Sequence, residues 1–208
     1  MKYRLRSLMS GIAILLLISV VSPLNLRAAT AGPQDQLKSS IDKLFVVLRD
    51  KNLKGDANRD LRREKIAEVV FMQFDMQRMA KFSLGRSWRD LKKTERDQFA
   101  NLFRKLLSKS YIATIDGYAG EEISYKKEII KGDKAEVRTM VIGSSKEIPL
   151  NYKLKLSDGR WLIYDVIIEN VSLVRNYRSQ FSPIVKKSGF SGLIEKMEKK
   201  IAEAKENG

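Results

Sequence analysis

The side chains that most often carry out catalysis are missing from this sequence. Its 208 residues include no histidine and no cysteine, which removes the imidazole base, the thiol nucleophile and the usual zinc ligands. The nucleophile, phosphate-binding and dinucleotide motifs G-x-S-x-G, G-x-x-x-x-G-K-[ST] and G-x-G-x-x-G are also absent. Acidic residues remain as candidates for acid–base chemistry.

Asp165 is the strongest of these candidates, because it lies within an apolar run that is expected to form a strand. Burial there would raise the pKa of its carboxyl group and suit it to proton transfer. The alternative is structural, with the carboxylate neutralised by a nearby arginine or bonded to backbone amides. No second group with an assignable role accompanies Asp165. We therefore predict no catalytic residue, no metal site and no cofactor.

The N-terminus has the layout of a cleaved secretory signal peptide over residues 1–29. Three basic residues lie within positions 2–6, an apolar run covers 11–21, and small residues that suit cleavage follow at 28–31. The apolar run is shorter than the roughly 20 residues of a membrane-spanning helix, and an uncleaved anchor is the alternative. We expect residues 30–208 to form one domain in the periplasm, stable without disulfides.

The charge of the chain is strongly positive. The formal charge of +15 falls by four to +11 without residues 1–29, which hold four basic and no acidic residues. In a cytosolic protein such an excess indicates nucleic acid, but the export signal argues against that partner. Phospholipid head groups and acidic protein surfaces are the remaining polyanions, and each basic residue near an anionic membrane contributes about 1 kcal/mol. The alternative is that scattered lysines and arginines keep the surface soluble.

Apolar residues at helical spacing predict four helices in the first half of the chain. Asp75 is expected to cap the third helix and Gly85 to end it. Thr94 and Asp97 resemble a capping box at the start of a long helix. The four helices are expected at residues 34–53, 61–74, 76–84 and 94–118.

Four β-like runs follow, separated by short turn signals. Such short connections favour an antiparallel meander. The third run alternates between apolar and polar residues and should have one wet face, whereas the fourth is apolar on both faces and must be covered on both sides. The runs occupy residues 122–130, 134–142, 148–156 and 160–168.

Two amphipathic helices are expected after the sheet, at residues 173–185 and 190–201. Helices, then an antiparallel sheet, then helices indicate an α+β domain. The predicted architecture is a curled meander sheet of about four strands, packed with the N-terminal and C-terminal helices.

Four stretches of the sequence are distinctive: DMQRMA with LGRSWR within residues 75–89, ERDQF at 95–99, GRWLIYDV at 159–166 and ENVSLVRNYRSQF at 169–181. Together they resemble the MlaC or toluene-tolerance family of periplasmic phospholipid-transport proteins, over about residues 34–201. Asn170 stands where the family is expected to have glycine. Asparagine tolerates a left-handed backbone better than most residues, so we expect the turn to survive.

The resemblance implies a fold that encloses an apolar cavity and shields the acyl tails of a phospholipid. The cargo would move between an outer-membrane lipoprotein complex and an inner-membrane ABC transporter with its substrate-binding subunit. Because burying one methylene contributes ~0.8 kcal/mol, two acyl chains of roughly 30 methylenes would cost ~25 kcal/mol in water. Family members linked to hopanoid synthesis loci leave a hopanoid or other isoprenoid cargo as an alternative.

The inward faces of the strands and of the long helix are the best candidates for the cavity wall. The alternative is that these residues fill an ordinary close-packed core. The predicted wall consists of Phe103, Leu107, Tyr111, Ile115, Val137, Val141, Leu150, Tyr152, Leu154, Trp161 and Ile163.

Arg178 has two possible roles. It could pair with Asp165 or Asp75 and lock the last helices to the body of the domain. Alternatively, it could contact a lipid phosphate at the cavity mouth, because arginine matches phosphate geometry well.

Two other classes of protein compete with the carrier. An enzyme using an acidic base would need a polar pocket. An adaptor that only docks other envelope proteins would have a solid core without a cavity. Fold analogy alone cannot separate these classes.

Overall fold

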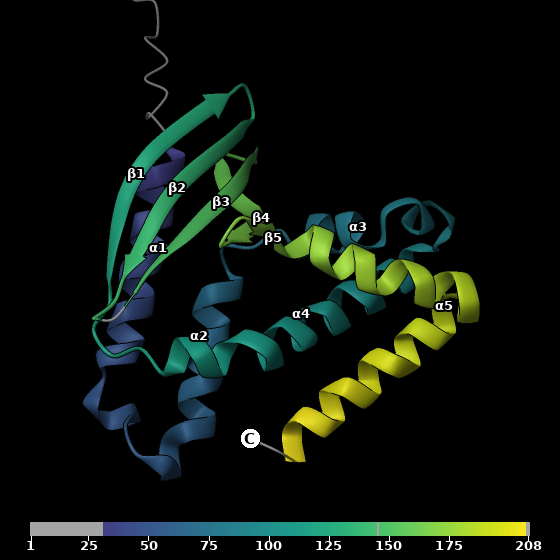
Figure 1. Cartoon of the computed structure of the whole chain (residues 1–208), viewed down its shortest axis with the longest axis horizontal. Helices are drawn as coiled ribbons and strands as arrows, with labels where there is room; N and C mark the ends of the chain where they lie inside the picture. The colour runs from purple at the N-terminus through teal and green to yellow at the C-terminus, as the bar shows by residue number, and fades with distance from the viewer. Residues whose placement is uncertain (1–30, 145, 207–208) are drawn as a thin grey trace, which may run out of the picture.

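The chain folds into an antiparallel sheet flanked by helices, as seen in a computed structural model that describes residues 31–144 and 146–206 (Figure 1). The predicted signal peptide lies outside the described residues. The described part holds five α-helices, three short 3-10 helices and one five-stranded sheet. The α+β class expected from the sequence is confirmed.

The first half of the chain is helical, and Asp75 and Gly85 act as predicted. The Asp75 carboxylate accepts a hydrogen bond from the Arg78 amide at 2.9 Å, and Gly85 ends the helix with a φ of 62°. The elements are α1 (Pro33–Arg49), η1 (Lys51–Leu53), η2 (Asp56–Asn58), α2 (Arg59–Phe71), α3 (Met76–Leu84), η3 (Gly85–Asp90) and α4 (Lys93–Asp116).

The predicted capping box at Thr94 is wrong. Helix α4 begins at Lys93, and the Glu95 carboxylate accepts a hydrogen bond from the Lys92 amide at 2.7 Å. Glu95 thereby satisfies one of the amides that a helix N-terminus leaves unpaired. Its negative charge also favours the first turn of the helix.

The sheet is the predicted antiparallel meander, in the order β1-β2-β3-β4-β5. The strands are β1 (Glu122–Lys131), β2 (Lys134–Ile142), β3 (Glu147–Ser157), β4 (Arg160–Ile168) and β5 (Val171–Ser172). The two-residue β5 was not predicted, because so short a run carries no periodicity. Register shifts at Tyr125/Lys127 and at Lys153/Leu154 increase the local twist and help the sheet to curl.

The C-terminal helix α5 (Leu173–Glu206) is two helical segments joined at Gly189, as the sequence predicted. Gly189 has φ 68° and ψ −174°, a conformation that glycine adopts without steric cost. The break reverses the direction of the chain, so that the second segment runs back at an angle to the first (Figure 1). Asn170, in the turn before α5, has a φ of 69°, which is the left-handed conformation expected for it.

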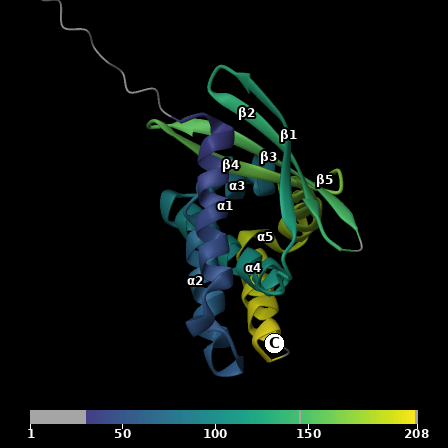
Figure 2. The same ribbon diagram turned by 90° about the vertical axis from the view of Figure 1, so that its left-hand side faces the viewer.

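Helices α4 and α5 enclose a solid aromatic core. The Phe103 ring stacks on Phe99 at 5.9 Å and meets the edges of Tyr177 at 5.0 Å and Phe181 at 5.8 Å. Such pairs add about 0.5–1.5 kcal/mol each beyond the area they bury. Figure 2 views the molecule from the left-hand side of Figure 1, where α1 lies against the sheet and α2 packs beside α1. This second half contains the cavity described below.

Asp165 is structural rather than catalytic. Its side chain is buried and accepts hydrogen bonds from the Ser172 hydroxyl at 2.7 Å and from the Val174 amide at 3.2 Å. Ser172 in turn accepts a hydrogen bond from the Arg175 amide at 3.2 Å. The carboxylate therefore satisfies one free amide at the start of α5 and holds the Ser172 hydroxyl that satisfies another, which is the structural alternative named above.

Replacing Asp165 with alanine tests this role. We expect Asp165→Ala to lower the free energy of unfolding by about 2 kcal/mol, because a helix cap and a buried acceptor are lost together. Urea denaturation followed by circular dichroism measures the change. Asp90→Ala, at an exposed aspartate, should stay within about 0.5 kcal/mol. Equal effects of the two substitutions would contradict the capping role.

Candidate functional site

An apolar cavity of about 470 Å³ lies between the sheet, α1, α2 and the C-terminal half of α4. This volume falls within the range of about 300–1,000 Å³ that is usual for ligand sites. Its wall is mainly aliphatic and aromatic, and the cavity is partly open to solvent. Exposed or partly exposed residues of the α4–β1 connection and the β2–β3 turn belong to its lining, so we infer that the opening lies beside them. The adaptor interpretation required a solid core and is therefore not supported.

The sheet contributes rows of neighbouring side chains to this wall. Ile123, Val141 and Ile148 are direct cross-strand neighbours on β1, β2 and β3. Tyr152 and Val166 form a further cross-strand pair on β3 and β4. All five line the cavity, because side chains two residues apart on a strand face the same way. The curl of the sheet thus shapes a concave apolar surface.

The polar side chains at the inner end of the cavity are paired with one another. The Ser40 hydroxyl donates to Gln73 Oε1 at 2.9 Å, and the Gln73 amide donates to the Trp161 carbonyl at 2.6 Å. The Trp161 amide donates to Gln36 Oε1 at 2.9 Å. Among the described residues, no buried side-chain nitrogen or oxygen lacks a partner. The inner end of the wall therefore makes no polar demand on a ligand.

Seven of the eleven residues predicted to line the cavity do so in the structure. They come from α4 and from strands β2, β3 and β4. They are Leu107, Tyr111, Ile115, Val141, Leu150, Tyr152 and Ile163.

The other four predicted residues lie outside the cavity wall. Phe103 belongs to the aromatic core between α4 and α5. Val137, Leu154 and Trp161 face the interior but are buried in the packed core. The side chains of these three strand residues point to the interior, as expected. At their positions, however, the interior is already filled by other side chains. For these four, the close-packed alternative is correct.

Sequence reasoning missed the contribution of α1 and α2. Leu44, Phe45 and Leu48 from α1, with Val69 and Val70 from α2, line the cavity. The signal was present as an apolar stripe on each helix. An apolar stripe does not show whether it faces side chains or an open space, so the predicted cavity wall included no residue from either helix.

Arg178 contacts a different part of the molecule from either predicted partner. Asp75 pairs with Arg78 at 2.8 Å, and Asp165 caps α5. Arg178 is exposed and lies over Gly85, where an added Cβ would be 2.6 Å from its Nε atom. It therefore joins α5 to the end of α3 by contact, and it lies outside the cavity wall. The predicted ion pairs with Asp75 and Asp165 are wrong.

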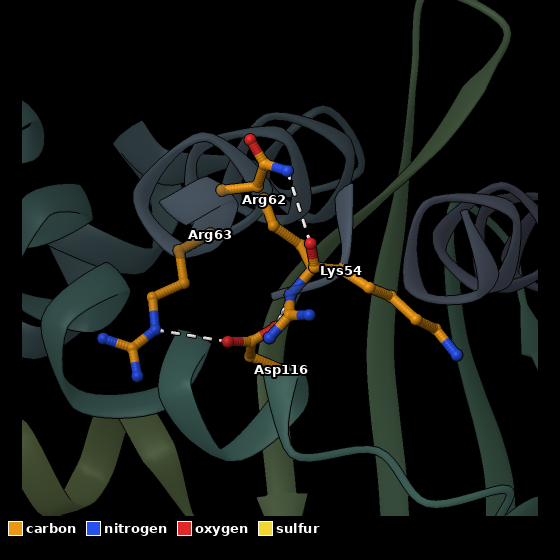
Figure 3. Close-up of polar contacts among 5 residues, drawn as sticks. Lys54, Arg62, Arg63 and Asp116 are labelled. Carbon is orange, nitrogen blue, oxygen red and sulfur yellow. Dashed lines mark hydrogen bonds and ion pairs between the residues drawn. The ribbon is translucent and has the colours of Figure 1, made fainter. Parts of the chain in front are cut away.

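Two arginines hold α2 against the end of α4 (Figure 3). Arg62 Nε lies 2.5 Å from Asp116 Oδ1, and Arg63 Nε lies 3.3 Å from Asp116 Oδ2. The Asp116 side chain is only 5% exposed. A carboxylate at the last turn of a helix opposes the helix dipole, so these cations compensate a charge that would otherwise be unfavourable. The contact thereby ties together two helices that both contribute residues to the cavity wall.

A second contact lies at the opening. The Phe45 and Tyr118 rings, from α1 and from the α4–β1 connection, are 5.0 Å apart. Arg49 lies over the Phe45 ring at 5.0 Å and donates to the Tyr118 hydroxyl at 3.2 Å. Both rings line the cavity, so this cluster borders the opening on the α1 side.

Tyrosines inside the cavity remain neutral. Burial raises the pKa of Tyr111 to about 12, and burial also raises the pKa of Tyr152 well above its ordinary value. Desolvation of the charged form is the main cause in both cases. These phenols therefore present no charge to a ligand.

The described residues hold no group of three or more acidic side chains that could bind a metal ion. None of their helices is both long and apolar enough to cross a membrane. An α+β fold with an open cavity whose wall is mainly apolar is the architecture of a binding protein for an apolar ligand.

Comparison with known proteins assigns the family. The model of the MlaC protein family matches residues 38–199, and the chain belongs to this family. It is 22% identical over 185 residues to the intermembrane phospholipid transport system binding protein MlaC of Haemophilus influenzae, covering 84% of this chain and 85% of that protein.

A solved structure shares the fold. It is a phospholipid-binding protein from Ralstonia solanacearum in complex with a phospholipid, with a TM-score of 0.74 and 23% sequence identity. The match covers 84% of this chain and 99% of the other. The sequence resemblance to the MlaC family is thus confirmed.

Removing the charge at Asp116 tests the contact between α2 and α4. We expect Asp116→Asn to lower the free energy of unfolding by about 2 kcal/mol, since hydrogen bonds to charged groups contribute about 1.5–3 kcal/mol. Chemical denaturation measures the change. Asp60→Asn, at an exposed aspartate of α2, should cost less than about 1 kcal/mol. If the two variants are equally stable, Asp116 does not hold the helices together.

Proposed function

We propose that this protein is a periplasmic lipid carrier, which takes the acyl tails of a phospholipid into its apolar cavity and moves the lipid between membranes. The cavity between the sheet, α1, α2 and α4 is the observation that carries the proposal. Membership of the MlaC family and the phospholipid bound by the structural relative support it.

The cavity addresses the main barrier to such transfer. Tails in water would cost ~0.8 kcal/mol for each methylene, and the wall supplies an apolar surface whose polar groups are already paired. No bond changes in the process, so the carrier requires no catalytic group. The enzymatic alternative has lost its candidate, because both carboxylate oxygens of Asp165 are used at the start of α5.

Location and partners follow from the signal peptide and the family. A secretory signal at residues 1–29 would place the mature chain in the periplasm. The proposed partners are an outer-membrane lipoprotein complex and an inner-membrane ABC transporter with its substrate-binding subunit. The name of the Haemophilus influenzae relative, which refers to an intermembrane phospholipid transport system, supports this arrangement.

Filling the cavity provides a direct test. Ile123, on β1, lines the cavity, whereas Ile130 on the same strand is 50% exposed. We expect Ile123→Trp to reduce the bound phospholipid per chain at least about fivefold, because displacing even two methylenes forfeits ~1.6 kcal/mol. Ile130→Trp is the matched control and should leave the bound lipid unchanged.

The measurement is mass spectrometry of lipids extracted from protein purified from its native envelope, with circular dichroism as the check on folding. Wild-type protein should carry close to one phospholipid per chain. A hopanoid in place of phospholipid would change the assigned cargo. Wild-type protein free of any lipid, even after incubation with phospholipid vesicles, would refute the proposed function.

A further inference from the structure

Charged side chains gather at one edge of the cavity opening. Of the described residues that line the cavity, Glu121 and Lys146 are the two that carry a charge. Glu121 directly precedes β1, and Lys146 directly precedes β3. Each is two residues from a cavity-lining isoleucine, Ile123 or Ile148, so it lies on the same face of the sheet. Both isoleucines are cross-strand neighbours of Val141. Glu121 and Lys146 therefore stand where the apolar wall meets solvent, and we call them the rim pair.

Gly143 lies between the two residues of the rim pair and contacts the segments that carry them. The Gly143 amide donates to the Lys146 carbonyl at 3.0 Å, which closes the β2–β3 turn. A Cβ placed on Gly143 would lie 3.3 Å from that carbonyl oxygen and 3.5 Å from Glu121 Cγ. The Glu121 side chain thus packs directly against the turn that carries Lys146.

The backbone fixes the Glu121 carboxylate in this position. Its Oε2 atom accepts a hydrogen bond from the Ala119 amide at 2.9 Å. Backbone hydrogen bonds also hold the pKa of this carboxyl group below its ordinary value. A negative charge therefore stays at the opening, next to the turn that carries the exposed Lys146.

A lipid phosphate alone does not account for this arrangement. Lys146, and Arg49 on the α1 side of the opening, offer positive charge that suits a phosphate. Glu121 would repel the same phosphate. A head group that carries both a phosphate and an ammonium gives each rim charge a partner of opposite sign.

We propose that the rim pair is a head-group subsite for zwitterionic phospholipids, with Lys146 beside the phosphate and Glu121 beside the ammonium. The inference rests on the proposed function, because the acyl tails must occupy the cavity for the head group to lie at its rim. An anionic glycerol head group places no cation beside Glu121. A hopanoid without a phosphate leaves Lys146 without a partner.

Competitive loading tests the subsite. The full mature chain is incubated with vesicles that contain equal amounts of phosphatidylethanolamine and phosphatidylglycerol with the same acyl chains, then re-isolated and extracted for mass spectrometry. Because both lipids come from one membrane, the attraction between the +11 charge of the protein and the anionic vesicle surface brings the protein equally close to both. We expect about three- to fivefold more bound phosphatidylethanolamine, which is the size of effect that an exposed ion pair produces.

Two variants separate the roles of the rim pair. Glu121→Gln keeps the acceptor for the Ala119 amide and should bring the ratio of the two lipids close to one. Lys146→Gln should lower the total lipid bound while the ratio changes little, since both lipids carry a phosphate. Glu122→Gln and Lys131→Gln are matched controls at exposed positions of β1, and they should leave both quantities unchanged.

The outcomes distinguish the subsite from the carrier function. A wild-type ratio of one, or a Glu121→Gln ratio equal to that of wild type, overturns the subsite but leaves the carrier intact. Equal effects of Glu121→Gln and Glu122→Gln also overturn it, because general surface charge then explains the preference. If wild-type protein takes up neither lipid, the proposed function itself fails.

Discussion

The structure depends on an apolar space that the chain does not fill with its own side chains. At ~24 cal/mol per Å³, an empty closed void of the 470 Å³ seen here would cost on the order of 10 kcal/mol, which is comparable to the whole stability of a typical domain. The opening to solvent avoids a closed void, but it leaves apolar wall in contact with water. A hydrocarbon ligand removes this contact, so the empty protein has a built-in preference for lipid tails.

Helix α4 allows a hollow half and a solid half to coexist in one domain. Its N-terminal half is held by the rings of Phe99 and Phe103 against α5. Its C-terminal half borders the cavity and is tied to α2 through Asp116. Stability is therefore supplied mainly where no ligand enters.

Polar groups are used differently in the two regions of the cavity. At the inner end, Ser40, Gln73 and the Trp161 backbone satisfy one another, so hydrocarbon can lie there without leaving a hydrogen bond unmade. At the opening, charges stand at the solvent boundary, where their desolvation costs little. This division matches the amphipathic character of a phospholipid, with tails inside and a polar head at the rim.

The sequence by itself determined the long helices and strands, the meander topology and the α+β class, because these follow from local periodicity, caps and short turns. Asp75 and Gly85 are examples, since each acts within its own turn of helix. It also determined that histidine and cysteine chemistry is excluded. The tertiary structure decided which apolar faces meet side chains and which face open space. Val137 and Val141 lie on the same face of β2, yet only Val141 borders the cavity, because the curl of the sheet and the placement of α1 and α4 set where packing ends.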